Sequence, residues 1–324
     1  MSNLKEAAQL FREKQSFALI GHTNPDGDTL GSTLALGLGL LKMGKKVMML
    51  NIDGVPEIYR FLPGSDQILK PKAVHFTAQV VVCVDCSDIK RAGDEVIPWI
   101  SGANTIINID HHISNDYFGT INIVEPEAAS AGIIVKQMLE ELGVIIDKDI
   151  ATCLYVSLVT DTGSFKFSNT TPQSHQVAAE LLSTGLDQEL VNRELYEEVP
   201  LNSLRLIQAG LDNLQITPCG TVAWMTFNRQ IMEKLKAKDE HLEGVVNYAK
   251  AIKGVEVGIL FRESRDKLVK ISFRSKSTVN VSDLAAKFGG GGHIRAAGCR
   301  YRESLENAVN KVVATALEAV QGTK

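Results

Sequence analysis

The sequence predicts an α/β protein with two parts: an N-terminal doubly wound, mostly parallel sheet and a smaller C-terminal α+β domain. Strand-like and helix-like segments alternate through the first half of the chain, which favours parallel strands covered by helices. Residues 79–84 (QVVVCV) form an apolar, mostly β-branched run, as expected for a strand buried on both faces. After residue 213 the order of elements changes, and the polar residues 264–267 between two strand-like runs indicate a hairpin.

The elements expected in the first half follow from short apolar runs for strands and amphipathic stretches for helices. Strands are expected at residues 16–20, 46–50, 79–84 and 105–109, and helices at residues 29–43, 128–142, 148–160, 172–183 and 188–197. In the second half, strands are expected at residues 214–217, 221–227, 256–262 and 268–274, and helices at residues 229–236, 241–251, 281–288 and 304–320. We therefore expect an N-terminal domain at residues 1–186, a helical linker at 187–213 and a C-terminal domain at 214–324, with a cleft between the domains.

Composition restricts the function. The net charge of −4 argues against a protein that coats long nucleic acids. Residues 253–302 nevertheless hold 11 Lys and Arg against 4 Asp and Glu, which indicates either a basic docking face or an ordinary solvated surface. The chain shows neither a signal-peptide pattern nor an apolar run long enough for a membrane span, and its five cysteines are sparse. We therefore expect a cytoplasmic protein without a membrane partner.

Acidic and histidine side chains follow the expected strands. His22, Asp26 and Asp28 come directly after the first strand, where an N-cap role for Asp28 is the alternative to metal binding. Asp85 ends the most apolar strand, where a carboxylate is costly unless it is exposed or binds a cation. Because ligands collect beyond the carboxyl ends of parallel strands, we expect these side chains to meet at one edge of the sheet.

Two further clusters belong to the same edge. Asp110-His111-His112 follows the next strand, and Asp161 ends an apolar helix, where the helix dipole disfavours a negative charge. Together the clusters offer too many oxygen and imidazole ligands for one catalytic ion, and they suit two ions about 3.5–4 Å apart. Such ligands fit Mn²⁺, with Fe²⁺ or Co²⁺ as alternatives and Mg²⁺ weaker.

The C-terminal half contains a run of four glycines followed by His293. Backbone N–H groups of such a run can approach an anion closely, although a flexible turn is the alternative. Arg274 and Ser275, at the end of an expected strand, could supply further contacts to a nucleotide phosphate.

These motifs together resemble the DHH/DHHA1 phosphoesterase family, over nearly the whole chain. The resemblance includes His22-Thr-Asn-Pro-Asp26-Gly-Asp28, Asp85, the triplet Asp110-His111-His112, Asp161 and Gly289-Gly-Gly-Gly-His293. It implies that His22, Asp26 and Asp85 hold one Mn²⁺ and that Asp28, Asp85, His111 and Asp161 hold the other. It also implies that His112 faces the scissile phosphate, that Asp110 orients an imidazole, and that Arg274, Ser275, Gly289, Gly290, Gly291, Gly292 and His293 bind the substrate.

The resemblance further implies hydrolysis of short oligoribonucleotides to mononucleotides, and of pAp to AMP, by two-metal activation of water. The modest net charge agrees with a short substrate, which needs few phosphate contacts. Hydrolysis of cyclic di-AMP or pApA is an alternative that the sequence leaves open. A nucleotide sensor without turnover is less consistent with the full set of ligands. Members of the family often form homodimers, which we therefore also expect.

Overall fold

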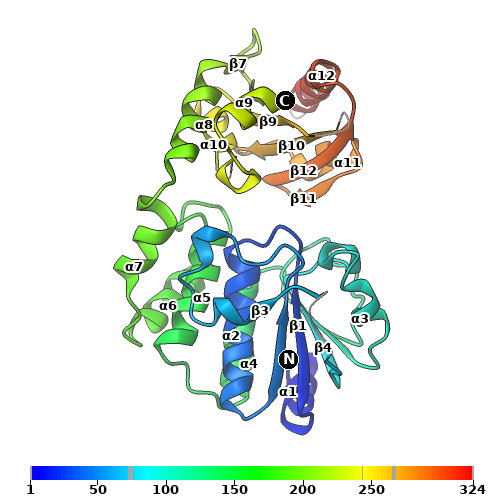
Figure 1. Cartoon of the computed structure of the whole chain (residues 1–324), viewed down its shortest axis with the longest axis vertical. Helices are drawn as coiled ribbons and strands as arrows, with labels where there is room; N and C mark the ends of the chain where they lie inside the picture. Colours follow the sequence, from blue (N-terminus) through cyan, green and yellow to red (C-terminus); the bar gives the residue numbers. More distant parts are fainter. Residues whose placement is uncertain (1, 72–75, 243, 265–267, 323–324) are drawn as a thin grey trace. The chain divides into compact units, whose positions relative to one another are not determined.

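The computed structural model describes residues 2–71, 76–242, 244–264 and 268–322 and divides into two compact units, Met1–Glu198 and Val199–Lys324 (Figure 1). Within the described residues, each unit contains one six-stranded sheet. The expected α/β class, with a parallel first sheet and a smaller second unit, is confirmed. Among the described helices, none has the length and apolar character needed to cross a bilayer.

The sheet of the first unit has the strand order β3-β2-β1-β4-β5-β6, and every neighbouring pair is parallel. Its strands are β1 (Ser16–Gly21), β2 (Lys46–Leu50), β3 (Ile68–Leu69), β4 (Val80–Val84), β5 (Ile106–Asp110) and β6 (Ile121–Val124). The order reverses between β1 and β4, which is the point where doubly wound sheets bind their ligands.

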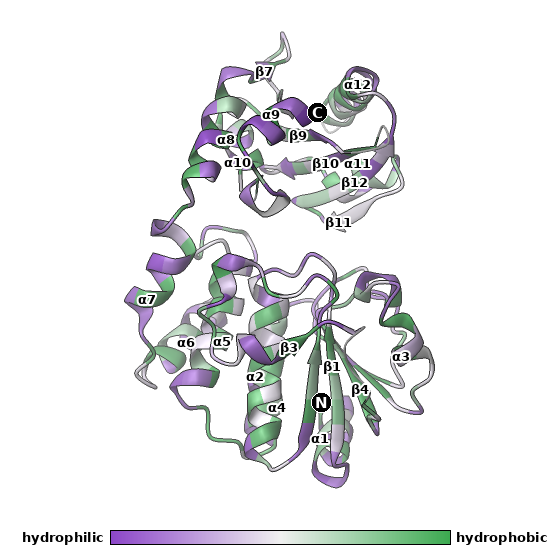
Figure 2. Ribbon diagram, in the orientation of Figure 1, coloured by the Kyte–Doolittle hydropathy of each residue, from purple (hydrophilic) through white to green (hydrophobic). Residues whose placement is uncertain are grey.

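Helices cover both faces of this sheet (Figure 1). They are α1 (Ser2–Glu13), α2 (Gly27–Lys42), α3 (Ile97–Ser101), α4 (Ala131–Glu141), α5 (Lys148–Asp161), α6 (Pro172–Leu182) and α7 (Gln188–Asn192). Short helical turns are η1 (Glu57–Tyr59), η2 (Ser65–Gln67), η4 (Ile89–Ala92) and η5 (Arg193–Glu197). Side chains of β1 alternate between the two faces: Phe17 and Leu19 pack with α1, α2, α4 and α5, and Ile20 packs with η4 and α3. Figure 2 shows the apolar character of α2, which is buried along most of its length.

The sheet of the second unit has the strand order β11-β12-β10-β9-β8-β7 and is mixed, because β8 and β9 are parallel while the other pairs are antiparallel. Its strands are β7 (Gln215–Ile216), β8 (Val222–Phe227), β9 (Val257–Glu263), β10 (Leu268–Ser275), β11 (Gly291–His293) and β12 (Ala296–Arg302). Its helical segments are α8 (Leu201–Asp212), α9 (Arg229–Lys234), η6 (Asp239–Leu242), α10 (Val246–Ala251), α11 (Val281–Ala286) and α12 (Leu305–Gly322).

Several elements differ from the sequence-based expectation. Strands β3, β6 and β12 were not expected, because each is short or interrupted by polar and small residues. Gly291, Gly292 and His293 form β11, which pairs with β12, so the alternative of a flexible turn is wrong for this part of the run. Strands β9 and β10 are antiparallel neighbours, as the expected hairpin requires, although residues 265–267 of its turn lie outside the described residues.

The segment expected as a helical linker, residues 187–213, is largely helical. Helix α7 and the π-helical turn η5 belong to the first unit, and α8 belongs to the second. Leu206 of α8 is fully buried against Ala223 and Met225 of β8. This packing makes α8 part of the core of the second unit.

Candidate metal centre

Six candidate metal ligands of the first unit lie in one cluster. They come from the loop after β1, the first turn of α2, the residue after β4, the residue after β5 and the last residue of α5: His22, Asp26, Asp28, Asp85, His111 and Asp161. The arrangement follows from the parallel sheet, because β1, β4 and β5 are consecutive neighbours whose carboxyl ends lie at the same edge.

Asp85 occupies the middle of the cluster. Its Oδ2 lies 3.3 Å from His22 Nε2, and its Oδ1 lies 3.6 Å from both His111 Nε2 and His112 Nδ1. The Thr29 hydroxyl donates a 2.6 Å hydrogen bond to Oδ2, whereas Oδ1 is buried without a hydrogen-bond partner among the described residues. Asp85 therefore has the position that a carboxylate shared by two cations would require.

His22 and Asp26 complete one side of the cluster. His22 Nε2 is 3.7 Å from Asp26 Oδ2, and a 2.8 Å contact joins its Nδ1 to the carbonyl of Thr23. Asp26 is also the N-cap of α2, where its Oδ1 accepts a hydrogen bond from the backbone N–H of Thr29. The alternative of Asp28 as the N-cap is wrong, because the helix begins at Gly27 and Asp28 lies inside its first turn.

Asp28, His111 and Asp161 form the other side. His111 Nε2 is 3.4 Å from Asp28 Oδ2 and 3.6 Å from Asp161 Oδ2. Asp28 is held firmly, because its Oδ1 accepts hydrogen bonds from the hydroxyls of Ser32 and Ser157 at 2.9 and 2.6 Å. The backbone N–H groups of the first two residues of α4 also donate to this carboxylate.

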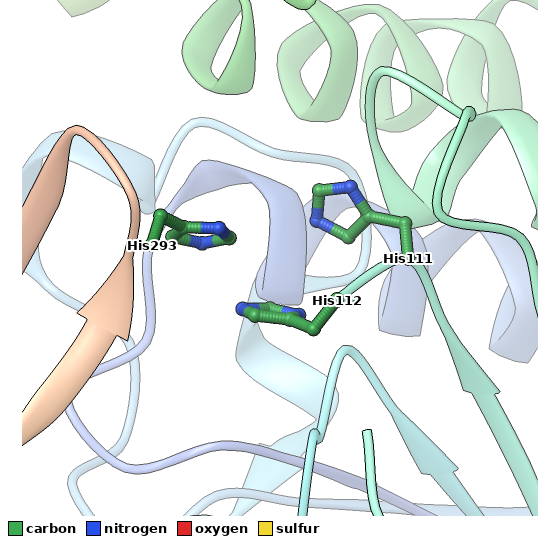
Figure 3. A group of neighbouring side chains, drawn as sticks. All are labelled: His111, His112 and His293. Atoms are coloured by element: carbon green, nitrogen blue, oxygen red, sulfur yellow. The ribbon is translucent and has the colours of Figure 1, made fainter. Parts of the chain in front are cut away.

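His112 is paired with Asp110. His112 Nδ1 lies 2.7 Å from Asp110 Oδ1, and Asn115 Nδ2 donates a 2.6 Å hydrogen bond to Asp110 Oδ2. Asp110 is completely buried, so the carboxylate can hold the imidazole ring in one orientation. The rings of His111 and His112 are 5.0 Å apart and meet edge to face (Figure 3).

The donor set fits divalent cations. The groups His22-Asp26-Asp85 and Asp28-Asp85-His111 each bring their ligand atoms within 4.8 Å of one another, and they share Asp85. Burial lowers the pKa of His22, but the hydrogen bonds and charges of Asp26 and Asp85 outweigh it and raise the pKa to about 10. Burial, followed by the charge of Asp85, raises the pKa of Asp28 to about 6. Carboxylates that lie this close together favour a positive charge between them, which a bound metal ion would supply.

The predicted substrate-binding residues lie in the second unit. Arg274 of β10 and His293 of β11 are on the same face of the sheet, because both pair across the strands with Ala296. Ser275 is buried, and its hydroxyl contacts the carbonyl of Ile294 at 3.5 Å.

Close contact with another strand explains why two positions of the glycine run hold glycine. A Cβ at Gly290 would lie 2.2 Å from the carbonyl oxygen of Gly298, and one at Gly292 would lie 2.6 Å from that of Ala296. Gly292 also has φ +145°, which favours glycine. A Cβ at Gly291 would meet nothing within 4 Å.

Sequence reasoning missed the residues that hold the candidate ligands and Asp110 in place. They are Thr29, Ser32 and Ser157 for the ligands, and Asn115 for Asp110. Hydroxyl and amide side chains are common in loops and helices, so their type alone gives no signal. Their position one turn from a ligand on α2, or five residues after Asp110, is the only pattern that could have indicated Thr29, Ser32 and Asn115.

Comparison with known proteins identifies the family of the chain. The model of the DHH family N-terminal domain matches residues 16–158, and that of the DHHA1 domain matches residues 222–322. A bifunctional oligoribonuclease and PAP phosphatase, NrnA, from Thermus thermophilus is 32% identical over 93% of this chain and 87% of its own length. The chain belongs to the DHH/DHHA1 phosphoesterase family. It is thus a phosphoric-ester hydrolase.

Two other relatives are informative about this DHH/DHHA1 phosphoesterase. The crystal structure of an exopolyphosphatase-related protein from Bacteroides fragilis has a TM-score of 0.91 and 30% identity, and the match covers 98% of this chain and 96% of that one. A cyclic-di-AMP phosphodiesterase, PdeA, from Listeria monocytogenes is 24% identical over 96% of this chain but only 48% of its own length.

Proposed function

We propose that this DHH/DHHA1 phosphoesterase uses two Mn²⁺ ions to hydrolyse short oligoribonucleotides to mononucleotides and pAp to AMP. The observation that carries the proposal is the cluster around Asp85, whose buried Oδ1 has no hydrogen-bond partner among the described residues. The choice of substrate is supported by the similarity to NrnA over most of both chains. Free thiols on all five cysteines agree with a cytoplasmic location.

The two sides of the cluster define the proposed ligand sets. His22, Asp26 and Asp85 would hold one ion, and Asp28, Asp85, His111 and Asp161 would hold the other. When bound, the ions supply Lewis-acid polarisation of the phosphoryl group and lower the pKa of water. Ser32, Ser157 and the start of α4 keep the Asp28 carboxylate in place for this task.

His112 is the proposed catalytic proton carrier. The acceptor at Asp110 Oδ1 keeps a proton on His112 Nδ1, so that Nε2 is the atom at which His112 can hold or transfer a second proton. Nε2 could therefore hydrogen-bond the scissile phosphate or protonate the leaving oxygen. In the second unit, we propose that Arg274 and the run from Gly289 to His293 bind the nucleotide, while Ser275 supports the backbone near Ile294.

The proposal is tested by hydrolysis of pAp, pApA, a five-nucleotide RNA and cyclic di-AMP with Mn²⁺, each repeated with EDTA and after Mn²⁺ is restored in excess. We expect AMP from pAp and mononucleotides from the linear RNAs, loss of activity in EDTA, and recovery with Mn²⁺. Undiminished activity in EDTA would refute the metal assignment, and no turnover of any linear substrate would refute the function.

The similarity to PdeA favours one second candidate, a phosphodiesterase for cyclic di-AMP or its linear product pApA. The same experiment distinguishes the two. Faster hydrolysis of cyclic di-AMP than of the five-nucleotide RNA and pAp would favour the second candidate over the first.

A further inference from the structure

Within the described residues, helices cover one face of the second sheet over only about half of its width. Along β10, Val269, Ile271 and Phe273 are buried in a core with α11 and α12. Because side chains alternate along a strand, Lys270 and Arg274 lie on the opposite face, where both are half-buried. The two faces of β10 therefore have different surroundings.

The cover on that opposite face ends near the middle of the sheet. Helices α8, α9 and α10 pack there on Ala223, Met225 and Phe227 of β8 and on Leu260 of β9. Figure 1 shows α8 and α10 at one side of the unit and β11 and β12 at the other. Beyond β9, on β10, β12 and β11, the residues of this face are half-buried or exposed. They are Leu268, Lys270, Ser272, Arg274, Gly291, His293, Ala296, Gly298, Arg300 and Arg302.

Strand register places cations side by side on this face. Lys270 pairs with Arg262 of β9 on one side and with Arg300 of β12 on the other, so three positive side chains stand in one row across three strands. Like charges directly opposite each other destabilise a sheet. Among the described residues on this face of β9, β10, β11 and β12, none is acidic. Three cations in one row give this face the positive charge that attracts an anionic ligand.

A second row lies four residues further along β10, where Arg274 and His293, two side chains that can contact a phosphate, flank Ala296. Between the rows, Ser272 pairs with Gly298, which pairs with Gly291. These residues are small, so little side-chain bulk separates the two rows. An extended strand rises about 3.3 Å per residue, so four residues place the two rows about 13 Å apart.

We propose that this face is a binding platform for the phosphates of a short single-stranded oligonucleotide, with Lys270 and Arg300 as a second phosphate site beyond Arg274 and His293. The proposal rests on the proposed function and adds to it the residues that select for chain length. The two phosphates of pAp flank a single nucleoside, so a molecule bound at Arg274 does not extend to Lys270. A five-nucleotide RNA can contact both rows.

The test uses the double variant K270Q/R300Q in the full chain, with KM measured for a five-nucleotide RNA and for pAp in Mn²⁺. Loss of two charge-assisted phosphate contacts should raise the KM for the RNA by about tenfold or more. The KM for pAp should stay within about twofold of the wild-type value. Binding of fluorescein-labelled five-nucleotide RNA provides a readout without turnover. The slope of log affinity against log salt should decrease in magnitude by about 1.4, since each phosphate contact on a single strand contributes about 0.7.

K234Q, which removes one exposed positive charge on α9, is the control and should change neither KM. If K270Q/R300Q proves less stable to heat than the wild type, R300Q alone is measured, because Arg300 is exposed. An unchanged RNA KM and salt slope in the variants would overturn the platform, and so would an equal rise in KM for both substrates. Failure of the wild type to hydrolyse either substrate would instead refute the proposed function.

Discussion

Replacing Asp110 by Asn tests the proposed role of His112. In the wild type, Asp110 accepts from two donors at once: His112 Nδ1 on Oδ1 and Asn115 Nδ2 on Oδ2. An Asn side chain has a single acceptor oxygen, so either one of the two contacts would place donor against donor, or His112 would have to carry its proton on Nε2 in place of Nδ1. Asn115 cannot turn its amide without cost, because its Oδ1 accepts from the backbone N–H of Tyr117 at 2.7 Å. We therefore expect D110N to destabilise the His112 orientation.

The expected effect follows from the contacts. Loss of a hydrogen bond to a charged, fully buried group lowers the free energy of unfolding by about 1.5–3 kcal/mol. Loss of correctly oriented proton transfer should lower kcat about 10²- to 10⁴-fold, which corresponds to roughly 3–5 kcal/mol in the barrier. The KM for pAp should change little, because the substrate contacts proposed for the second unit remain.

The assay is phosphate release from pAp at saturating Mn²⁺, with the melting temperature measured in parallel. D147N is the matched control, since Asp147 caps α5 and pairs with Lys42 outside the site. It should lower stability while kcat is retained. A D110N protein that folds and keeps kcat within about threefold of the wild type would refute the assignment of His112 as the oriented proton carrier.

Three further predictions concern metal binding and stability. In D85N, kcat should fall more than about 10³-fold, and Mn²⁺ should no longer raise the melting temperature. In the wild type, Mn²⁺ at about 100 times its Kd should raise the free energy of unfolding by about 2.7 kcal/mol for each bound ion. Stabilisation of D85N by Mn²⁺ would contradict the shared-ligand role. G290A should lower the free energy of unfolding by about 1–3 kcal/mol, because its Cβ would lie 2.2 Å from a backbone carbonyl oxygen. G291A is the control, since a Cβ at Gly291 meets nothing within 4 Å. Equal effects of the two variants in a denaturant titration would show that close approach does not explain the glycine at position 290. Partial burial raises the pKa of Glu256, but hydrogen bonds from three backbone N–H groups lower this pKa more. The ionised Glu256 therefore stabilises the fold fully at a pH above the pKa of Glu256 in the unfolded chain. This stabilisation is lost as the pH falls through the lower pKa of the folded state. The difference in unfolding free energy between the wild type and E256Q should accordingly shrink below about pH 4.5, and a difference independent of pH would contradict this.

The sequence was sufficient to predict the α/β class and the set of clustered residues. Both depend on patterns that act over short distances: β-branched runs such as residues 79–84, and polar residues placed directly after them. Once parallel strands are assumed, geometry brings His22, Asp85 and His111 to one edge, whatever the details of the loops.

The residues that hold these ligands could not be predicted in the same way. Ser157 reaches Asp28 from a helix 129 positions away in the chain, and this contact depends on how α5 packs on α2. The first residue of α2 depends on which of two carboxylates is its N-cap. Asp is a preferred N-cap residue, so the sequence alone does not distinguish Asp26 from Asp28. Strand β11 formed from glycines, which have low strand propensity, because pairing with β12 outweighs that preference.

The backbone conformation at Asp85 explains why Asn is a better replacement than Ala for testing this carboxylate. Asp85 has φ 58°, in the left-handed region, directly after the extended residues of β4. This change of direction turns its carboxylate toward the histidines of two neighbouring loops, and the hydrogen bond from its N–H to the carbonyl of Ile109 secures it. Left-handed geometry costs most residues about 1 kcal/mol or more, but Asp and Asn tolerate it best. D85N therefore removes the charge while keeping the backbone conformation, whereas Asp85→Ala would combine the loss of the ligand with backbone strain.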